Sequence, residues 1–229
     1  MGKVNKEKSR PGKAIWSLTA AFLGAVLGVF FLAMSYRYFF FNLPLVLRAI
    51  LMTPLYWLVA VIPLVVWKKS GQTIASLGFT KAHPGQQILA GITLGLVMSI
   101  VLTLIPILTG FGEYVRNNKE YDQLWQFIYE FFYCIFGIGL AEEIVFRGIC
   151  FGFARQIKKS DTFAIILSSV LFGLFHFISG EILQMICMVF VGALFCLTRK
   201  KIPGCTLLSL ILAHGVYDAL IVVFSNVFK

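Results

Sequence analysis

Ionisable side chains recur inside the apolar second half of this sequence, where charge is costly. On the more lenient insertion scale, such a group at mid-bilayer costs on the order of 2.5–3.5 kcal/mol, so it usually faces a protein interior or a watery cavity. The sequence places few there, namely Glu142, Glu143, Arg147, His176, His214 and Asp218, with Arg48 and Glu130 nearer to span ends. Glutamate and histidine in a membrane, with no Ser or Cys nucleophile beside a base, indicate hydrolysis by activated water.

The spacing in GLAEEIVFRG gives its two glutamates different surroundings. Glu143 and Arg147 stand four residues apart and share one helix face, so they are predicted to pair. Glu142 is turned by ~100° from Glu143 and has no predicted partner in its own helix. Burial in a dry site would favour its use as a general base near neutral pH.

The same four-residue step appears in FGLFH, with Phe172 and His176, and in HGVYD, with His214 and Asp218. Phe172 is expected to pack beneath the His176 ring, and Asp218 to accept a hydrogen bond from His214 and fix its tautomer. The site therefore requires three helices to pack together. Small residues beside the motifs would permit that close packing: Gly137, Gly139, Ala141, Gly173 and Gly215.

Two routes to the activated water stay open at this point. The zinc-peptidase pattern H-E-x-x-H is absent, but Glu142, His176 and His214 could supply three ligands to Zn²⁺, with water as the fourth. Alternatively, Glu142 and a histidine activate the water directly.

The elements that position these residues are predicted to be membrane-spanning helices. The chain has 229 residues, 59% of them hydrophobic and 13% charged, with a mean hydropathy of +0.87. Apolar stretches long enough to cross a hydrocarbon core of ~30 Å recur along it, and no soluble domain fits between them. We predict an all-α, polytopic bundle of about seven spans, at 14–34, 44–67, 87–109, 125–152, 162–180, 182–198 and 203–225.

The charge distribution predicts the orientation of this bundle. Of the 20 Lys and Arg residues, fourteen fall in the N-terminal tail and alternate loops, which favours a cytoplasmic N-terminus. The net charge of +10 is explained by topology signals and contacts with anionic lipid, without nucleic acid. The predicted organisation is a basic cytoplasmic tail (1–13), N-terminal scaffold helices (14–123), a catalytic helical core (124–225) and a C-terminal tail (226–229). Five scattered cysteines are expected to be free, buried thiols.

The ordered set of motifs resembles that of the CPBP family, also called Abi, which comprises CAAX prenyl proteases and bacteriocin-processing enzymes. The resemblance rests on Glu142-Glu143-x-x-x-Arg147-Gly148, Phe172-x-x-x-His176 and His214-x-x-x-Asp218, and covers roughly residues 124–225. It implies an intramembrane endopeptidase of glutamyl or metallo type. It also implies that Glu142 and His176 activate water, and that His214 and residue 218 stabilise the oxyanion.

Residue 218 departs from the CAAX protease pattern, which has Asn there. An ionised aspartate cannot donate to an oxyanion, so Asp218 is expected to orient His214 or to bind a metal. Asp occurs in the bacterial branch, which this short chain resembles more closely. That branch implies a bacterial cell membrane and a peptide or membrane-protein substrate, in peptide or pheromone processing or in bacteriocin self-immunity.

Two functions of other classes compete with the protease. One is a non-catalytic membrane partner or immunity protein that binds a sensor kinase or receptor through the motif helices. The other is a proton-coupled transporter, which is disfavoured because no inverted repeat is found. The predicted span boundaries also separate Glu142 and His176 by over ~10 Å at 1.5 Å per residue. The fourth span should therefore extend further toward the cytoplasm, or the fifth should tilt or begin later.

Overall fold

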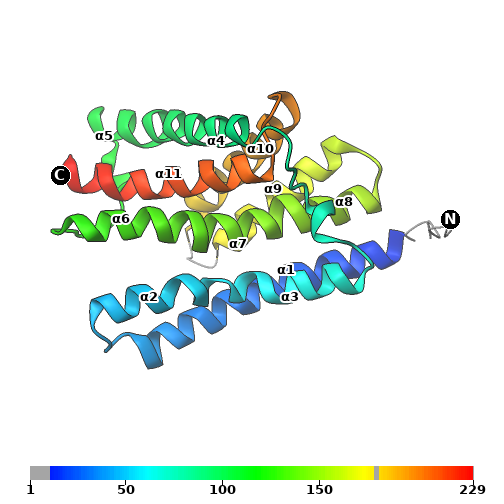
Figure 1. Ribbon diagram of the computed structural model, residues 1–229, viewed down its shortest axis with the longest axis horizontal. Coiled ribbons are helices and arrows are strands. Elements are labelled where there is room, and N and C mark those ends of the chain that lie inside the picture. Colours follow the sequence, from blue (N-terminus) through cyan, green and yellow to red (C-terminus); the bar gives the residue numbers. More distant parts are fainter. Residues whose placement is uncertain (1–10, 178–180, 229) are drawn as a thin grey trace.

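Helices form the secondary structure of the computed structural model, which describes residues 11–177 and 181–228 (Figure 1). The α-helices in these ranges are α1 (Pro11–Ser35), α2 (Leu45–Tyr56), α3 (Leu58–Lys69), α4 (Pro84–Ser99), α5 (Ile105–Leu108), α6 (Leu124–Tyr133), α7 (Leu140–Glu143), α8 (Phe151–Ile157), α9 (Asp161–His176), α10 (Ile182–Lys201) and α11 (Leu207–Val227). Most of the predicted basic tail (residues 1–10), the end of the predicted fifth span (178–180) and Lys229 lie outside the described residues.

Five helical segments of the described chain are long and apolar enough to cross a membrane: Pro11–Phe40, Leu45–Lys69, Pro84–Leu108, Ile182–Lys201 and Leu207–Val227. They correspond to the first three and last two predicted spans. The predicted span at 125–152 lies in a charged helix, and the predicted span at 162–180 corresponds to α9, an apolar helix of intermediate length. The protein is thus an integral, multi-pass helical membrane protein.

A single continuous helix runs through the centre of the bundle from Leu124 to Ile157. It consists of α6, α7 and α8 joined by two π-helical segments, η5 (Cys134–Gly139) and η6 (Ile144–Cys150), so wide turns flank Glu142 and Glu143 on both sides. Isolated π turns inside α-helices are often found at functional sites. The helix extends beyond the predicted boundary at 152, toward the end of the bundle where α1 begins. This is the direction of extension expected if Glu142 and His176 are to lie at the same depth in the membrane.

The remaining helices pack around this central helix in pairs. Helix α1 lies along α3, α4 lies along α11, and α9 lies along α10 (Figure 1). A break at Trp57 separates α2 from α3 within one span, three residues after Pro54. Because a proline disrupts the helical hydrogen-bond ladder, a bend at this point is expected, and Tyr56 is the last residue before it.

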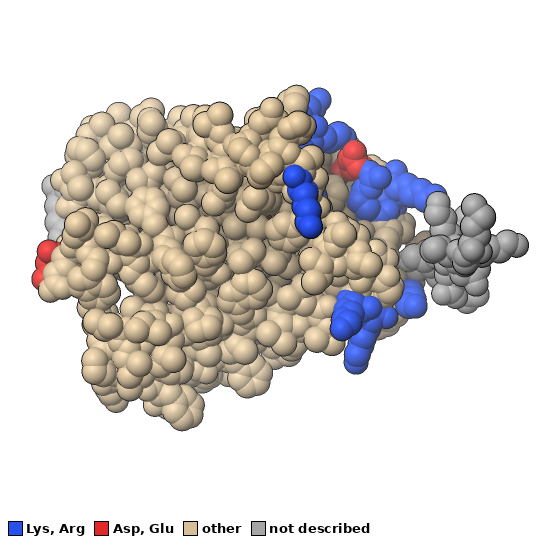
Figure 2. All heavy atoms as spheres, in the orientation of Figure 1, with Lys and Arg blue, Asp and Glu red and all other residues tan. Residues whose placement is uncertain are grey.

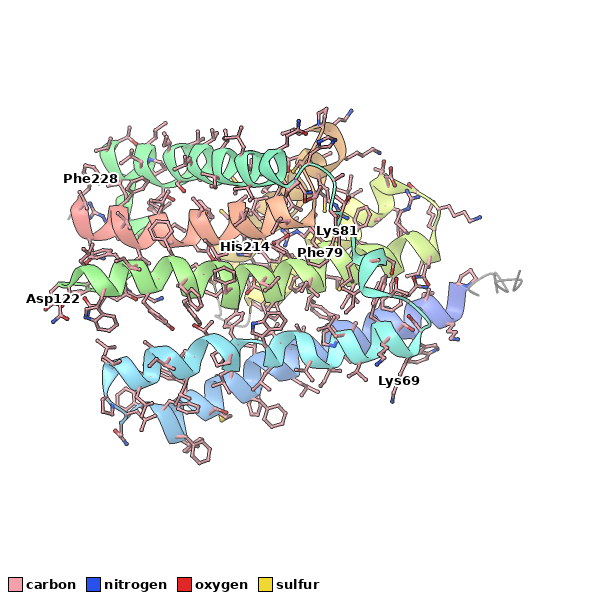
Figure 3. The ribbon with its side chains drawn as sticks, in the orientation of Figure 1. Lys69, Phe79, Lys81, Asp122, His214 and Phe228 are labelled. Carbon is pink, nitrogen blue, oxygen red and sulfur yellow. The ribbon has the colours of Figure 1, made fainter. Side chains whose placement is uncertain are left out.

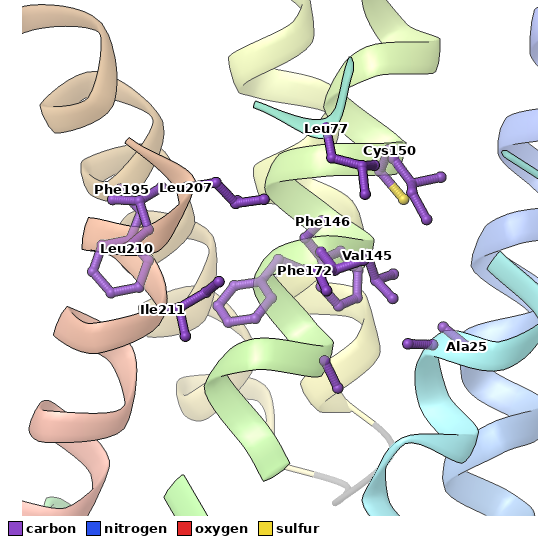
Figure 4. Packing of buried hydrophobic residues seen from close by; sticks show 14 of the residues in the cluster. Ala25, Leu77, Val145, Phe146, Cys150, Phe172, Phe195, Leu207, Leu210 and Ile211 are labelled. Atoms are coloured by element: carbon purple, nitrogen blue, oxygen red, sulfur yellow. The ribbon is translucent and has the colours of Figure 1, made fainter. Parts of the chain in front are cut away.

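Close backbone approaches hold α11 against the central helix. A Cβ atom added to Gly215 would lie 2.5 Å from the Ile135 Cα, and one added to Gly139 would lie 2.9 Å from the Ile211 carbonyl oxygen. The glycines near the motifs therefore serve helix packing, as their positions predicted. Around them, fully buried aromatic and aliphatic side chains such as Phe146, Phe172 and Leu210 fill the centre of the bundle (Figure 4).

Charge is concentrated at one end of the molecule. Lys and Arg side chains gather around the end where α1 begins, while most of the visible surface carries no charge (Figure 2). We define the basic end by the described residues Lys13, Lys68, Lys69, Lys81, Arg155, Lys158, Lys159, Arg199, Lys200 and Lys201. Large apolar side chains are widely exposed elsewhere, as expected for a surface that faces lipid.

Candidate active site

The structure brings the predicted site residues together from three helices. The central helix supplies Glu142, while α9 supplies His176 and α11 supplies His214. Glu142 Oε2 lies 3.9 Å from His176 Nε2 and 3.8 Å from His214 Nε2. The separation of over 10 Å implied by the predicted span boundaries is therefore wrong, and the three helices do converge.

Glu143 connects two partners through one carboxylate oxygen. Its Oε1 atom accepts a hydrogen bond from Arg147 at 2.9 Å, which confirms the predicted pair, and it also lies 2.8 Å from His214 Nδ1. Since the carboxylate oxygen is an acceptor, His214 Nδ1 carries the proton and donates it. Glu143 is completely buried, and Arg147 holds its carboxylate in place. The fixed carboxylate in turn orients the His214 ring.

The ring of His176 is held in one orientation and one tautomer. Its Nδ1 atom lies 2.9 Å from the Phe172 carbonyl oxygen, which can only accept. Nδ1 is therefore the protonated nitrogen, and Nε2 points its lone pair toward Glu142 in the neutral ring. The Phe172 ring packs edge-on against the imidazole with centroids 4.5 Å apart, as predicted.

The two oxygens of Glu142 have different environments. Oε1 accepts a short hydrogen bond from the Tyr56 hydroxyl. Oε2 is buried and has no hydrogen-bond partner. The distances from Oε2 to the two imidazole nitrogens are too long for direct hydrogen bonds. A water molecule can bridge polar atoms at such distances.

Asp218 lies next to the second nitrogen of His214. Its Oδ2 atom is 3.3 Å from His214 Nε2, at the predicted four-residue spacing. Both ring nitrogens of His214 thus face carboxylate oxygens, an arrangement that accommodates a doubly protonated, positively charged imidazole. Asp218 is partly exposed and lies on the side of His214 that faces the cavity.

Phe172 and Arg147 form the floor of the site. The Arg147 guanidinium carbon lies 4.0 Å from the centre of the Phe172 ring and 5.1 Å from that of Phe195. Such cation–π contacts contribute about 0.5–2 kcal/mol each and help to accommodate a buried cation. The Arg147 side chain is only 1% exposed, so Glu143 and these two rings are its main compensation for lost hydration.

The site opens into a cavity of about 270 Å³. Glu142, His176, His214 and Asp218 line it together with Tyr56. A polar cavity of this size can hold several water molecules, which are the nucleophile that hydrolysis would require.

The predicted metal alternative does not fit this arrangement. No group of three or more His, Cys, Asp and Glu side chains in the described ranges could hold a metal ion. Glu142 Oε1 is already bonded to Tyr56, and both nitrogens of His214 face carboxylates. We therefore derive no step through Zn²⁺.

Sequence reasoning missed Tyr56, which lies in the predicted scaffold segment 14–123 and donates a hydrogen bond to Glu142. An aromatic residue in an apolar span carries no spacing signal; the nearby Pro54 is the only feature that marks the place. The cysteine prediction was partly wrong: all five are free, but Cys187 is exposed whereas the other four are buried.

Glu130 also proved to be a buried carboxylate with several partners. It is 2% exposed and accepts from Lys119 Nζ at 2.6 Å and from the Tyr121 hydroxyl at 2.5 Å. Both partners come from the loop that precedes α6, a relationship that periodicity within a helix could not reveal.

A glutamate–histidine cavity inside a polytopic helical bundle is an arrangement that suits an intramembrane hydrolase. Residues 124–220 match the family model described as type II CAAX prenyl endopeptidase Rce1-like, and this match supports a CPBP-type intramembrane protease. The match begins at the first residue of α6 and includes all three motifs. The chain matches no curated protein and no solved structure. The family indicates a peptidase of the CAAX type.

Proposed function

We propose that this protein hydrolyses a peptide bond with a water molecule activated jointly by Glu142 and His176. The observation that carries the proposal is the 3.9 Å separation between Glu142 Oε2 and His176 Nε2. Both atoms are acceptors, because Nδ1 of His176 holds the ring proton. A water molecule between them would donate both of its protons and present its lone pairs to a carbonyl carbon.

The remaining side chains support the following reaction. As the water oxygen attacks the carbonyl carbon, one water proton passes to Glu142 or His176, and the carbonyl oxygen becomes an oxyanion. The same group then returns the proton to the departing amine as the C–N bond breaks. His214, charged between Glu143 and Asp218, has its Nε2 atom 3.8 Å from Glu142 Oε2 and would stabilise the oxyanion through Nε2–H.

Asp218 then acts through His214 and not directly on the substrate. As an ionised carboxylate it cannot donate a hydrogen bond to an oxyanion. Its 3.3 Å distance from His214 Nε2 favours a role in orienting and charging the imidazole. Tyr56 fixes the other oxygen of Glu142, which keeps Oε2 directed at the cavity.

The substrate that we propose is a peptide or a membrane-protein segment, in a bacterial cell membrane. The family description names prenyl endopeptidases, and processing of peptides, pheromones or bacteriocins remains within the same chemistry. Nothing about the reaction itself requires a prenyl group, since the groups described act on the peptide bond.

The test is cleavage by purified protein in detergent, using a proteome-derived peptide library and a farnesylated C-terminal peptide, with products identified by mass spectrometry. Glu142→Gln and His176→Ala should each abolish cleavage while the melting temperature stays close to that of the parent. Glu113→Gln, at an exposed position of the short 3-10 helix η4 (Gly112–Tyr114), is the matched control and should cleave normally. If both site variants cleave as the parent does, the proposal is wrong and a non-catalytic binding role gains support.

A further inference from the structure

As far as the described residues line it, the cavity that contains Glu142 extends toward one end of the bundle. From the site it continues along the central helix to Glu130 and reaches Asn117 and Lys119 in the loop before α6. Glu130 lies twelve positions before Glu142, which is roughly 18 Å at 1.5 Å per residue. An extended peptide covers this distance with about five residues, at ~3.3–3.6 Å each.

The far end of the cavity is framed by a loop that is fastened to the end of α11. The Asn117 amide donates to Ser225 Oγ at 2.9 Å, and the Tyr121 amide donates to Asn226 Oδ1 at 3.0 Å. Lys119 in this loop has a side chain that is 40% exposed and is paired with the buried Glu130. The cavity therefore reaches the exposed surface beside Lys119.

Toward the basic end, described side chains close the site. Arg147 stacks on Phe172 and Phe195, and the Phe146 ring lies 5.1 Å from that of Phe172, with all four side chains buried. A separate cavity of about 240 Å³ reaches Arg147 from the basic end, but Glu142 and the two histidines do not line it. Figure 4 shows the aromatic and aliphatic side chains that occupy this layer.

The cavity mouth and the basic end lie at opposite ends of the molecule. Lys69 and Lys81 lie toward the basic end, Asp122 and Phe228 lie at the other, and His214 lies between them (Figure 3). The loop at the mouth carries Glu113, Glu120 and Asp122 besides its basic residues. Because Lys and Arg concentrate on the cytoplasmic side of membrane proteins, the mouth is placed on the non-cytoplasmic side.

We propose that peptide and water reach Glu142 from the non-cytoplasmic side of the membrane, through the mouth beside Asn117 and Lys119. The proposal rests on the proposed function and narrows its substrates to peptide segments that are exposed on that side. Lys119 and Glu130 are then the charged groups that a substrate passes before it reaches the catalytic residues.

Cysteine accessibility tests the direction of entry without depending on catalysis. The five native cysteines are replaced by alanine, and single cysteines are introduced as Asn117→Cys at the mouth, Met188→Cys inside the cavity and Lys158→Cys at the basic end. Each variant is treated with a membrane-impermeant maleimide in right-side-out and in inside-out vesicles from the expressing cells. Labelling after denaturation shows that every thiol is present.

The proposal predicts that Met188→Cys is labelled in the same vesicle orientation as Asn117→Cys, and falls to background in the orientation that labels Lys158→Cys. Labelling of Met188→Cys together with Lys158→Cys would overturn it, and so would labelling in neither orientation. Adding Glu142→Gln should leave the labelling pattern unchanged. A loss of cleavage therefore reports on the proposed function, while the labelling reports on the entry side.

Discussion

His214 Nδ1 lies 2.8 Å from Glu143 Oε1, the same oxygen that accepts a hydrogen bond from Arg147. The second glutamate of the pair thus orients a histidine on another helix in addition to neutralising an arginine on its own. Glu142, its neighbour, contacts Tyr56 and faces the cavity instead. Adjacent carboxylates therefore have separate tasks, and substitutions should distinguish them.

Glu143→Gln should destabilise the protein strongly, whereas Glu142→Gln should not. Removing one partner of a buried ion pair leaves an uncompensated charge and typically costs about 3–5 kcal/mol. Thermal unfolding in detergent measures the difference. The double variant Glu143→Gln/Arg147→Met should recover part of the lost stability because it also removes the buried cation; no recovery would contradict the pairing as the main cause.

Tyr56→Phe should reduce cleavage more than it reduces stability. The lost hydrogen bond to an ionised carboxylate is worth about 1.5–3 kcal/mol, and its loss frees Glu142 Oε1 to rotate. We expect kcat to fall roughly 10- to 100-fold, the rate equivalent of that energy. Tyr133→Phe is the matched control, since the Tyr133 ring packs edge-on against Tyr56 at 6.0 Å. Equal losses in both variants would argue against a specific role for Tyr56.

Asp218→Asn should keep most of the activity, while Asp218→Ala should lose more of it. The asparagine oxygen can still accept from His214 Nε2, whereas alanine leaves that nitrogen without its neighbour. The comparison is made through kcat and KM, because a positioning role predicts a change in kcat with little change in KM. Full activity of Asp218→Ala would remove Asp218 from the mechanism.

Gly215→Ala should destabilise the bundle by about 1–3 kcal/mol, the usual cost of overpacking. The new methyl group would lie 2.5 Å from the Ile135 Cα, a backbone atom that cannot move aside alone. The control is Gly85→Ala, where the added methyl group has no neighbour within 4 Å. Melting temperatures of the two variants in the same detergent decide the matter, and equal values would be inconsistent with the close approach.

Tyr121 should make stability decline in alkaline solution. Burial, together with its hydrogen bond to Glu130, raises the pKa of the Tyr121 phenol above its usual value near 10. Its stabilisation is present below about pH 10, where both states hold the proton, and is lost as the pH rises from there toward the folded-state pKa. The slope of unfolding free energy above about pH 10 should be smaller in Tyr121→Phe, and an identical slope would refute this assignment.

Much of the site could be predicted because residues four apart in one helix share a face, whatever the packing of the other helices. Glu143–Arg147, Phe172–His176 and His214–Asp218 all meet as their spacing indicates. Contacts between helices were harder to predict from the sequence. The contacts Glu143–His214 and Tyr56–Glu142 depend on how the helices are rotated against each other. Hydropathy carries little information on that rotation.

The span boundaries failed for a related reason. The central helix continues from Leu124 to Ile157, past the charges that lower its hydropathy, and it contains two π segments that apolar patterning does not reveal. Because the boundary at 152 was too early, the expected depth of Glu142 was displaced from that of His176. The tertiary contacts of Arg147 and Glu143 make a charged helix stable at this position.

The wide turns on either side of Glu142 and Glu143 also restrict how the length of this segment can change. A π turn holds one residue more per hydrogen-bonded turn than an α turn, so a one-residue deletion within 144–150 could be absorbed only by closing that turn. A deletion that did not close the turn would instead rotate every residue beyond it by about 100° around the helix axis. Helix α8 would lose its present face toward α1, whereas the loop at 112–123 has no such periodic constraint. Insertions and deletions should therefore be excluded from the central helix and accumulate in the loop before it.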